Sequence, residues 1–126
     1  MYEELREMNN EIKRKQEYIA ELRALATSMT MTLSERVQTS PEDRLSNLMC
    51  KIIMAENELD TMVDEFADLK VKTKSEIFTL PYEDWQDILY MHYIEFKPFS
   101  DIADIKNISI NAVKKRNQRA LKYLKK

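Results

Sequence analysis

The stretch that decides the fold is Pro98–Lys126, PFSDIADIKNISINAVKKRNQRALKYLKK, and it predicts two short helices separated by a tight turn. The first helix is indicated by apolar residues at helical spacing, namely Phe99, Ile102, Ala103 and Ile105. The turn falls at Lys106-Asn107-Ile108, which has the right length to join two helices. After Ser109 the apolar residues fall on one side of a second helix: Val113, Ala120, Leu121 and Leu124. Together these features predict a helix-turn-helix.

The opposite side of the second helix is polar and basic. The second helix of such a motif enters the major groove of DNA, so we predict that the helix over residues 109–125 reads this groove. Side chains with amide or amine donors fit base edges, which favours Asn111, Lys115 and Gln118 for sequence recognition. Basic residues toward the flanks are expected to contact phosphates: Lys114, Arg116, Arg119 and Lys122. Ser109, as the N-cap of the helix, and Ala112 complete the predicted DNA-binding set.

Charge is distributed unevenly along the chain. From Lys106 onward there are eight Lys or Arg and no Asp or Glu, whereas residues 1–105 hold twelve basic and twenty-two acidic side chains. The simple alternative is a solvated face that complements the helix dipole, for which one or two cations would suffice. A basic cluster on a helix-turn-helix is the expected footprint of a nucleic-acid partner. The charge pattern therefore favours double-stranded DNA as a partner of this end.

The same residues resemble region 4 of sigma-70-type factors in type and spacing. The resemblance rests on Ile102-Ala103, Ile108-Ser109, Val113-Lys114, Arg116, Arg119-Ala120 and Leu124, with Leu80-Pro81, Trp85, Ile88-Leu89 and Tyr93-Ile94 upstream. It implies a DNA-binding helix-turn-helix that, as in the sigma family, also contacts RNA polymerase. Three residues depart from the pattern: Asn107 at a turn position often occupied by Gly, polar Asn117 on the inner face, and His92 where related phage proteins tend to have Arg. Asn tolerates the left-handed backbone conformation better than most residues.

The chain as a whole resembles short phage and prophage proteins of Gram-positive bacteria, the ArpU/RinA-like late-gene transcription regulators. Such proteins combine a coiled-coil N-terminal half, a junction like Val37-Gln38-Thr39-Ser40, and a sigma-like C-terminus. The resemblance implies a transcription regulator that is phage or prophage encoded and works in the cytoplasm of a bacterial host cell.

Two long amphipathic stretches precede the helix-turn-helix. The first has a heptad seam, interrupted by Lys15, at Leu5, Met8, Ile12, Ile19, Leu22, Ala26 and Met29. The second begins at Ser40-Pro41, a capping residue followed by Pro, and its seam comprises Leu45, Leu48, Ile52, Ala55, Leu59, Met62, Phe66 and Leu69. We expect a connection at Thr27–Thr39, a hinge or helix end at Lys70–Lys74, and a further helix from Pro81.

The sequence therefore predicts an all-α fold with two domains. Residues 1–75 would form a long, coiled-coil-like helical hairpin for oligomerisation or interaction, and residues 76–126 a sigma-70 region 4-like helix-turn-helix that binds DNA. Met49, Ile53 and Val63 widen the apolar stripe of the second helix beyond a simple seam. A homodimer through residues 1–75 is the simplest way to cover this stripe, although a different protein would serve equally well.

Composition disfavours several classes of function. The chain has 126 residues with no Gly, one Cys and one His, which argues against Gly-rich phosphate loops and most enzyme scaffolds. Cys50 and His92 lie on different predicted units, so they assemble neither a catalytic group nor a closed metal site. The sequence has no long apolar stretch to span a membrane. We expect no enzyme activity, no cofactor, no metal and no membrane partner.

Two classes of function remain. The first is a DNA-binding transcriptional regulator. The second is a protein-interaction adaptor that docks on RNA polymerase or phage packaging machinery through the hairpin and the basic helix. Region 4 of sigma factors contacts both DNA and polymerase, so the resemblance leaves both classes open. Salt-dependent binding to DNA would separate them.

Overall fold

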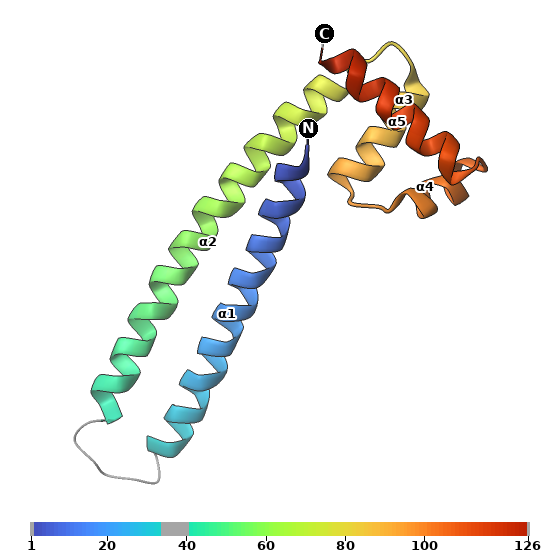
Figure 1. The fold of residues 1–126 in the computed structure, drawn as a ribbon. Helices are drawn as coiled ribbons and strands as arrows, with labels where there is room; N and C mark the ends of the chain where they lie inside the picture. Colours follow the sequence, from blue (N-terminus) through green and yellow to red (C-terminus); the bar gives the residue numbers. More distant parts are fainter. Residues whose placement is uncertain (1, 34–40, 126) are drawn as a thin grey trace. The chain divides into compact units, whose positions relative to one another are not determined.

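The computed structural model describes residues 2–33 and 41–125 (Figure 1). Its helices are α1 (Glu3–Leu33), α2 (Pro41–Ile77), α3 (Glu83–Leu89), the short π-helix η1 (Tyr90–Ile94), α4 (Phe99–Lys106) and α5 (Ile110–Leu124). The predicted all-α fold, with two long helices followed by a helix-turn-helix, is confirmed. The residues group in space into two units, Asn9–Glu65 and Met1–Met8 with Phe66–Lys126. The functional division into residues 1–75 and 76–126 stays a prediction, because spatial grouping does not test what each part does.

In the unit Asn9–Glu65, α1 and α2 lie side by side and antiparallel. Their core contains Ala26, Leu48 and Ile52, with half-buried Leu22, Met29 and Leu45 packed against it. Lys15 keeps its ammonium group at the edge of the seam, where Nζ lies 2.6 Å from Glu58 Oε2. Arg23 forms a second ion pair between the helices, with Glu56. An apolar seam flanked by opposite charges is sufficient to explain the pairing of these helices.

The first helix is longer than the sequence predicts, because α1 extends to Leu33 and the expected connection from Thr27 begins later. The Thr27 hydroxyl is accommodated inside the helix, where Oγ1 donates to the Arg23 carbonyl at 3.0 Å. The weak helix propensity of Thr is therefore overridden here. The rest of the predicted connection, including the Val37–Ser40 junction and the Ser40 cap, lies outside the described residues.

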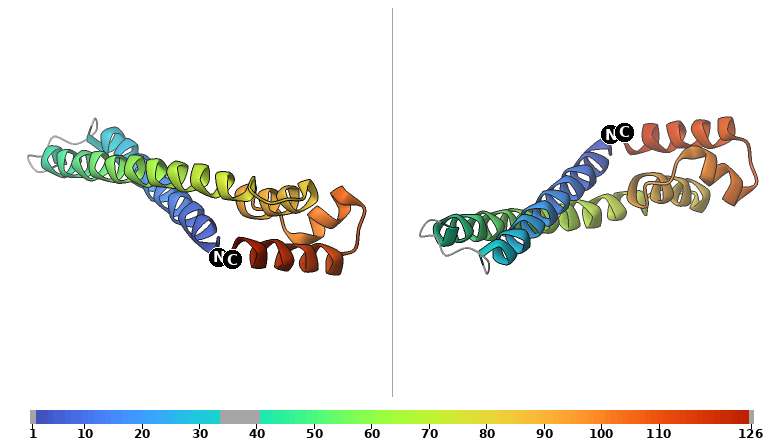
Figure 2. Two further views of the ribbon diagram at one scale, coloured as in Figure 1. Left: turned by 90° about the horizontal axis from the view of Figure 1, so that it is seen from above. Right: turned by 90° about the horizontal axis from the view of Figure 1, so that it is seen from below.

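The second helix continues through Lys70–Lys74 to Ile77, so the hinge or helix end predicted in that segment is wrong (Figure 2). Thr73 is 2% exposed and Ile77 is completely buried. These two residues are four positions apart and share one face of the helix, which packs into the core of its unit. The alternation of Lys with Val and Thr conceals this buried face in the sequence.

The core of the second unit joins segments from both ends of the chain. Tyr2, which directly precedes α1, and Leu5 in the first turn of α1 pack with residues of the C-terminal segment: Ile77, Leu80, Leu89, Ile94 and Ala120. The Tyr2 hydroxyl donates to Glu76 Oε2 at 2.8 Å, and the Tyr2 ring meets that of Tyr93 edge-on with centroids 5.5 Å apart. Burial, together with the Glu76 carboxylate, raises the pKa of Tyr2. The first turns of α1 are therefore part of the core on which the C-terminal helices pack.

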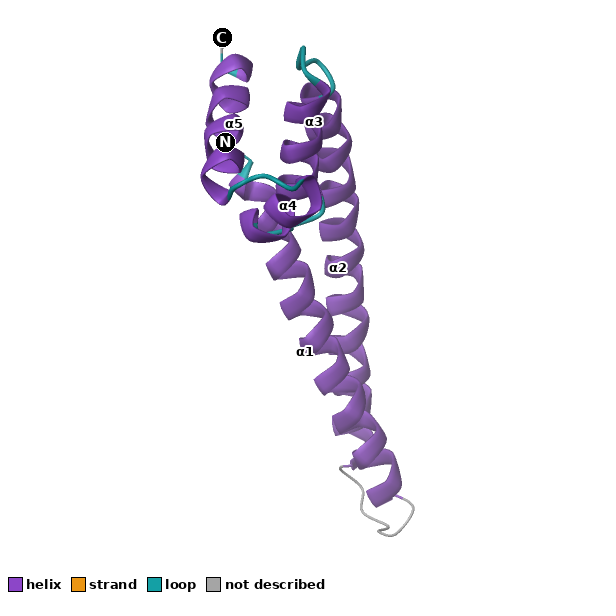
Figure 3. Cartoon of the chain, turned by 90° about the vertical axis from the view of Figure 1, so that its right-hand side faces the viewer, coloured by secondary structure: helices purple, strands orange, loops and turns teal. Residues whose placement is uncertain are grey.

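η1 follows α3 directly, and short loops join η1 to α4 and α4 to α5. No strand occurs anywhere along the described ranges (Figure 3). The helix predicted from Pro81 begins at Glu83, with Tyr82 in an extended conformation before it. In η1 the backbone N–H of Glu95 donates to the Tyr90 carbonyl at 3.1 Å, five residues earlier. Phe96 then adopts φ 61°, which is uncommon for a bulky residue. This turn redirects the chain into α4.

Candidate nucleic-acid interface

The turn between α4 and α5 is built on Asn107. Its backbone is left-handed, with φ 56° and ψ 43°. The next N–H, that of Ile108, donates to the Ala103 carbonyl at 3.1 Å and closes the end of α4. Asn is among the few residues that adopt this conformation readily. The prediction that Asn107 can replace Gly at this position is confirmed.

Ser109 is the N-cap of α5, as the sequence predicts. Its backbone is extended, and its Oγ accepts a hydrogen bond from the backbone N–H of Ala112 at 3.1 Å. Such a cap satisfies a donor that the first turn would otherwise leave unpaired, and it fixes where the helix begins. The cap therefore sets which side chains of α5 face outward.

The inner face of α5 is anchored at two points. Val113 is completely buried and packs with Ile88, Ile102 and Ala103 from α3 and α4. Ala120 lies seven residues further along the same face of α5 and is completely buried in the core that contains Leu89. The two anchors hold α5 with its opposite face directed to solvent.

Between these anchors lies Asn117, the polar residue that departs from the sigma pattern. It is 7% exposed, and its Nδ2 donates to the Tyr93 hydroxyl at 3.3 Å. Its Oδ1 is buried without a hydrogen-bond partner among the described residues. Burial raises the pKa of Tyr93, and the hydrogen bond from Asn117 partly opposes this shift. The Tyr93 hydroxyl thus accommodates a polar group inside the domain.

The outer face of α5 carries most of the predicted DNA-binding residues. Its exposed side chains include Asn111, Lys114, Lys115, Gln118, Arg119 and Lys122. Ser109 is also exposed, whereas Ala112 and Arg116 are half-buried. Within the part of the chain that the structure describes, Lys114, Lys115, Arg119 and Lys122 form no ion pair. We call the exposed set of Asn111, Lys114, Lys115, Gln118, Arg119 and Lys122 the outer face. Its contact with DNA stays a prediction.

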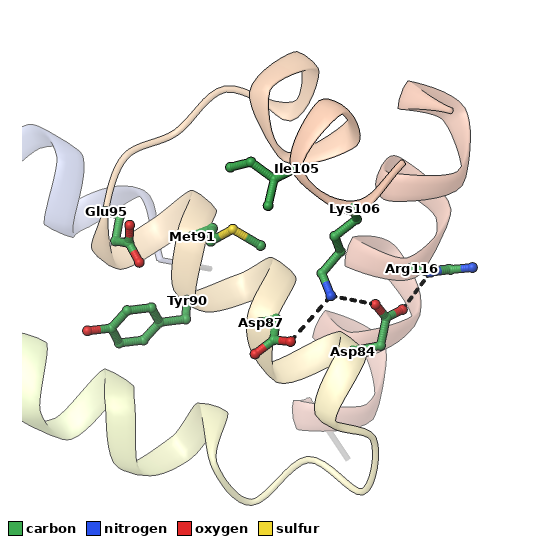
Figure 4. A pocket seen from close by; sticks show the side chains of 8 residues that line it. All are labelled: Asp84, Asp87, Tyr90, Met91, Glu95, Ile105, Lys106 and Arg116. Carbon is green, nitrogen blue, oxygen red and sulfur yellow. Dashed lines mark hydrogen bonds and ion pairs between the residues drawn. The ribbon is translucent and has the colours of Figure 1, made fainter. Parts of the chain in front are cut away.

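Arg116 forms an ion pair within the protein. Its Nη1 lies 2.7 Å from Asp84 Oδ2, while Lys106 Nζ lies 2.8 Å from Asp84 Oδ1 and 3.3 Å from Asp87 Oδ2 (Figure 4). These four residues line one part of an open groove of about 550 Å³. Asp84 comes from the first turn of α3, Lys106 from the last turn of α4 and Arg116 from α5.

The titration behaviour of this cluster follows from its geometry. Burial by itself would raise the pKa of Asp84, but the hydrogen bonds and charges of Lys106 and Arg116 more than offset it and lower the pKa. Burial would likewise lower the pKa of Lys106, and the carboxylates of Asp84 and Asp87 raise it instead. Both shifts favour the charged forms, so the ion pairs persist at neutral pH.

Sequence reasoning missed this cluster. It assigned Arg116 to a phosphate contact and named no partner for Asp84. The two residues are 32 positions apart, and no local spacing rule relates them. The single clue is charge complementarity between a strongly basic tail and the acids of the preceding helix.

The comparison with known families agrees with this geometry. A family model described as Sigma-70, region 4 matches residues 76–124, which include α3, η1, α4 and α5. This segment is a sigma-70 region 4-like helix-turn-helix domain. Sigma-70 region 4 is a DNA-binding, non-catalytic domain. No curated protein and no solved structure matches the chain. The match covers less than half of the chain and does not extend to the hairpin.

His92, the other departure from the sigma pattern, is a structural residue of the sigma-70 region 4-like domain. Its Nδ1 donates to the Lys97 carbonyl at 2.9 Å, and its ring stacks on Phe99 with centroids 4.0 Å apart. Burial lowers the pKa of His92, and the bond to Lys97 only partly opposes this shift. Cys50 is exposed on α2.

Residues 2–33 and 41–125 contain no group of three or more His, Cys, Asp or Glu placed to bind a metal ion. None of the helices there is both long enough and apolar enough to pass through a lipid bilayer.

Proposed function

We propose that the protein is a DNA-binding transcriptional regulator that inserts α5 into the major groove. The observation that carries the proposal is the outer face, on which amide side chains lie together with four cations that form no ion pair within residues 2–33 and 41–125. A duplex offers base edges within the groove and phosphates along its rims, so central amides and flanking cations suit both. The family match over residues 76–124 supports the same function.

In this proposal, different residues of the outer face contact the bases and the phosphates. Asn111, Lys115 and Gln118 contact base edges and supply sequence preference. Lys114, Arg119 and Lys122 neutralise phosphates and supply affinity that is independent of sequence. Ser109 acts indirectly, because its cap sets the start of α5 and hence the depth at which Asn111 meets the bases.

The test is binding of the full chain to labelled duplexes at several salt concentrations, with a preferred site first selected from a random library. The binding constant is expected to fall linearly with salt on logarithmic axes. Lys122→Ala should weaken binding to every duplex alike and reduce the slope by about one. Gln118→Ala should cost about 1–3 kcal/mol on the preferred site and little on random DNA. Binding that does not depend on salt would contradict the proposal.

We also propose that the chain works as a homodimer assembled through its hairpin. Met49, Ile53 and Val63 on α2 are 42%, 54% and 42% exposed. A second copy that covers them would remove apolar surface from water. Light scattering of the full chain should give a dimer, and Ile53→Lys should convert it to a monomer. The matched control is Leu25→Lys, at a residue on α1 that is 52% exposed. A monomeric wild-type protein would exclude the dimer.

We further propose that the chain is a phage or prophage late-gene regulator and that RNA polymerase is a second partner. The resemblance of the whole sequence to such regulators supports the first point. A cluster of aromatic rings supports a protein partner, because aromatic residues are enriched at protein interfaces. The ring centroid of Trp85 lies 4.7 Å from that of Tyr82 and 6.5 Å from that of Tyr123. Tyr82 and Tyr123 are 58% and 48% exposed. Capture from lysogenic cells should recover polymerase, and Tyr123→Ala should reduce its recovery. Capture of DNA without polymerase would exclude the second partner.

A further inference from the structure

One cation of the DNA-binding helix is already paired with a carboxylate. Arg116 lies on the flank of α5 beside α3, where its Nη1 donates to Asp84 Oδ2 at 2.7 Å. The other oxygen of the same carboxylate accepts from Lys106 Nζ at 2.8 Å. Asp84 therefore holds one cation from α5 and one from the end of α4, as Figure 4 shows.

These ion pairs are partly shielded from water, most of all at Lys106. The side chains of Lys106, Arg116 and Asp84 are 18%, 36% and 37% exposed. Partial burial strengthens an ion pair because less solvent screens it. The lowered pKa of Asp84 and the raised pKa of Lys106 agree with this geometry.

A carboxylate and a phosphate compete for the same N–H donors. Lys106 and Arg116 belong to the eight cations from Lys106 onward that the sequence offers for DNA binding. Lys106 and Arg116 each donate to Asp84. Each of these cations must leave Asp84 before all of its N–H donors can bind the DNA backbone. The cost of breaking a shielded pair offsets the gain from the new phosphate contact.

We propose that Asp84 is a specificity-determining positioning residue that withholds Arg116 and Lys106 from the DNA backbone. The inference rests on the proposed DNA-binding function. Affinity for random DNA comes mainly from phosphate contacts, so two withheld cations lower it. The base contacts proposed for Asn111 and Gln118 are unaffected, because these side chains lie on the outer face. The result is a larger ratio of affinity for the preferred site to affinity for random DNA.

Asp84→Asn tests this inference, because the amide keeps the size of the side chain and removes its charge. The affinity of the full chain for random duplexes is expected to rise about three- to tenfold near physiological salt, with a salt slope steeper by about one to two. The ratio of preferred to random binding should fall. Circular dichroism and denaturant unfolding establish that the variant is folded.

Asp104→Asn is the matched control. Asp104 is an exposed residue of α4 and forms no ion pair in the part of the chain that the structure describes. This variant changes the net charge by the same amount but releases no cation, so its salt slope should stay close to that of the wild type. Equal effects of Asp104→Asn and Asp84→Asn would overturn the inference, since net charge alone would explain both.

A second comparison stands even if Asp84→Asn does not fold. Arg116→Ala in the otherwise wild-type chain should leave random-DNA affinity and its salt slope nearly unchanged, whereas Lys122→Ala should reduce the slope by about one. Equal losses from the two substitutions would show that Arg116 contacts phosphate and would overturn the inference. In a folded Asp84→Asn background, Arg116→Ala should remove part of the gained affinity.

DNA binding by the wild-type protein distinguishes a failure of this inference from a failure of the proposed function. If the wild type shows no salt-dependent binding to any duplex, the proposed function fails and the inference fails with it. If the wild type binds and Asp84→Asn leaves the slope unchanged or shallower, the function stands and the role of Asp84 is wrong.

Discussion

The hairpin of residues 9–65 and the sigma-70 region 4-like domain both contain ion pairs, but these pairs contribute differently to the two structures. In the hairpin, Lys15–Glu58 and Arg23–Glu56 flank a long apolar seam, and the Glu58 side chain is 58% exposed. In the domain, Asp84 links three short helices through Lys106 and Arg116. Exposed pairs beside a seam stabilise little, because the seam holds the helices without them. Short helices depend on contacts between elements, so a single carboxylate has more influence on how the three helices of the domain pack. Under the proposed function, it also influences the charge that the domain offers to DNA.

Among the substitutions that test this comparison, Leu5→Ala is expected to have the largest effect on the free energy of unfolding. Leu5 is 1% exposed in the core shared with Ala120, so its truncation should cost about 2–5 kcal/mol of unfolding free energy. DNA binding should weaken with it, because the affected core supports α5. The matched control is Leu25→Ala, at a residue 52% exposed on the same helix, which should cost less than about 0.5 kcal/mol. Denaturant unfolding measures both, and equal costs would contradict the placement of Leu5 in the domain core.

A moderate effect is expected from Ser109→Ala. The substitution removes the oxygen that accepts from the Ala112 N–H, so the domain should lose about 1 kcal/mol of unfolding free energy. Ser75→Ala is the control in α2, because the Ser75 hydroxyl donates to the Val71 carbonyl within a continuous helix and caps nothing. A loss from Ser109→Ala no larger than that from Ser75→Ala would argue against a capping role.

A smaller change in the free energy of unfolding is expected when pH falls, because of His92. The pKa of His92 is lowered by burial, so the unfolded chain takes up a proton at a higher pH than the folded protein does. The free energy of unfolding should therefore be fully retained above the ordinary His pKa of 6.5 and decrease as pH falls below it.

His92→Gln should show a weaker dependence between about pH 7.5 and pH 5.5, a window above the usual range of carboxylates. Unfolding of both proteins at the two pH values makes the comparison. A wild type that gains stability on acidification over this window would have the opposite sign to the one expected.

The smallest effect is expected in the hairpin. Glu58→Gln removes one partner of the Lys15 ion pair, and the exposure of this pair limits the loss to less than about 0.5 kcal/mol. Thermal unfolding with and without added salt would measure it. A loss of several kcal/mol would erase the distinction between the ion pairs of the two regions.

Features encoded by neighbouring residues could be predicted from the sequence. The apolar seams gave the long helices, Ser109 the start of α5, and Asn107 the left-handed turn, because each depends on spacing or on one residue's backbone preference. The buried face of α5 around Val113 followed from the same periodicity.

Features that depend on distant residues could not be predicted. Tyr2 meets Glu76 across 74 positions, and Arg116 meets Asp84 across 32 positions. Periodicity carries no information at such separations. For this reason neither the contact of Tyr2 with Glu76 nor that of Arg116 with Asp84 was predicted from the sequence. The continuation of α2 beyond Lys74 was missed for the same reason, since Ile77 is buried by partners from elsewhere in the chain.

Charge reversal on the outer face tests the central claim most directly. The variant carries Lys114→Glu, Lys115→Glu and Arg119→Glu, and its control carries Lys13→Glu, Arg14→Glu and Lys51→Glu at exposed positions of the hairpin. The measurement is the dissociation constant for labelled duplex DNA, with folding checked by circular dichroism. If the outer face is the DNA surface, the first variant should lose about a hundredfold or more in affinity and the control should change little. Intact binding in the first variant would contradict the account.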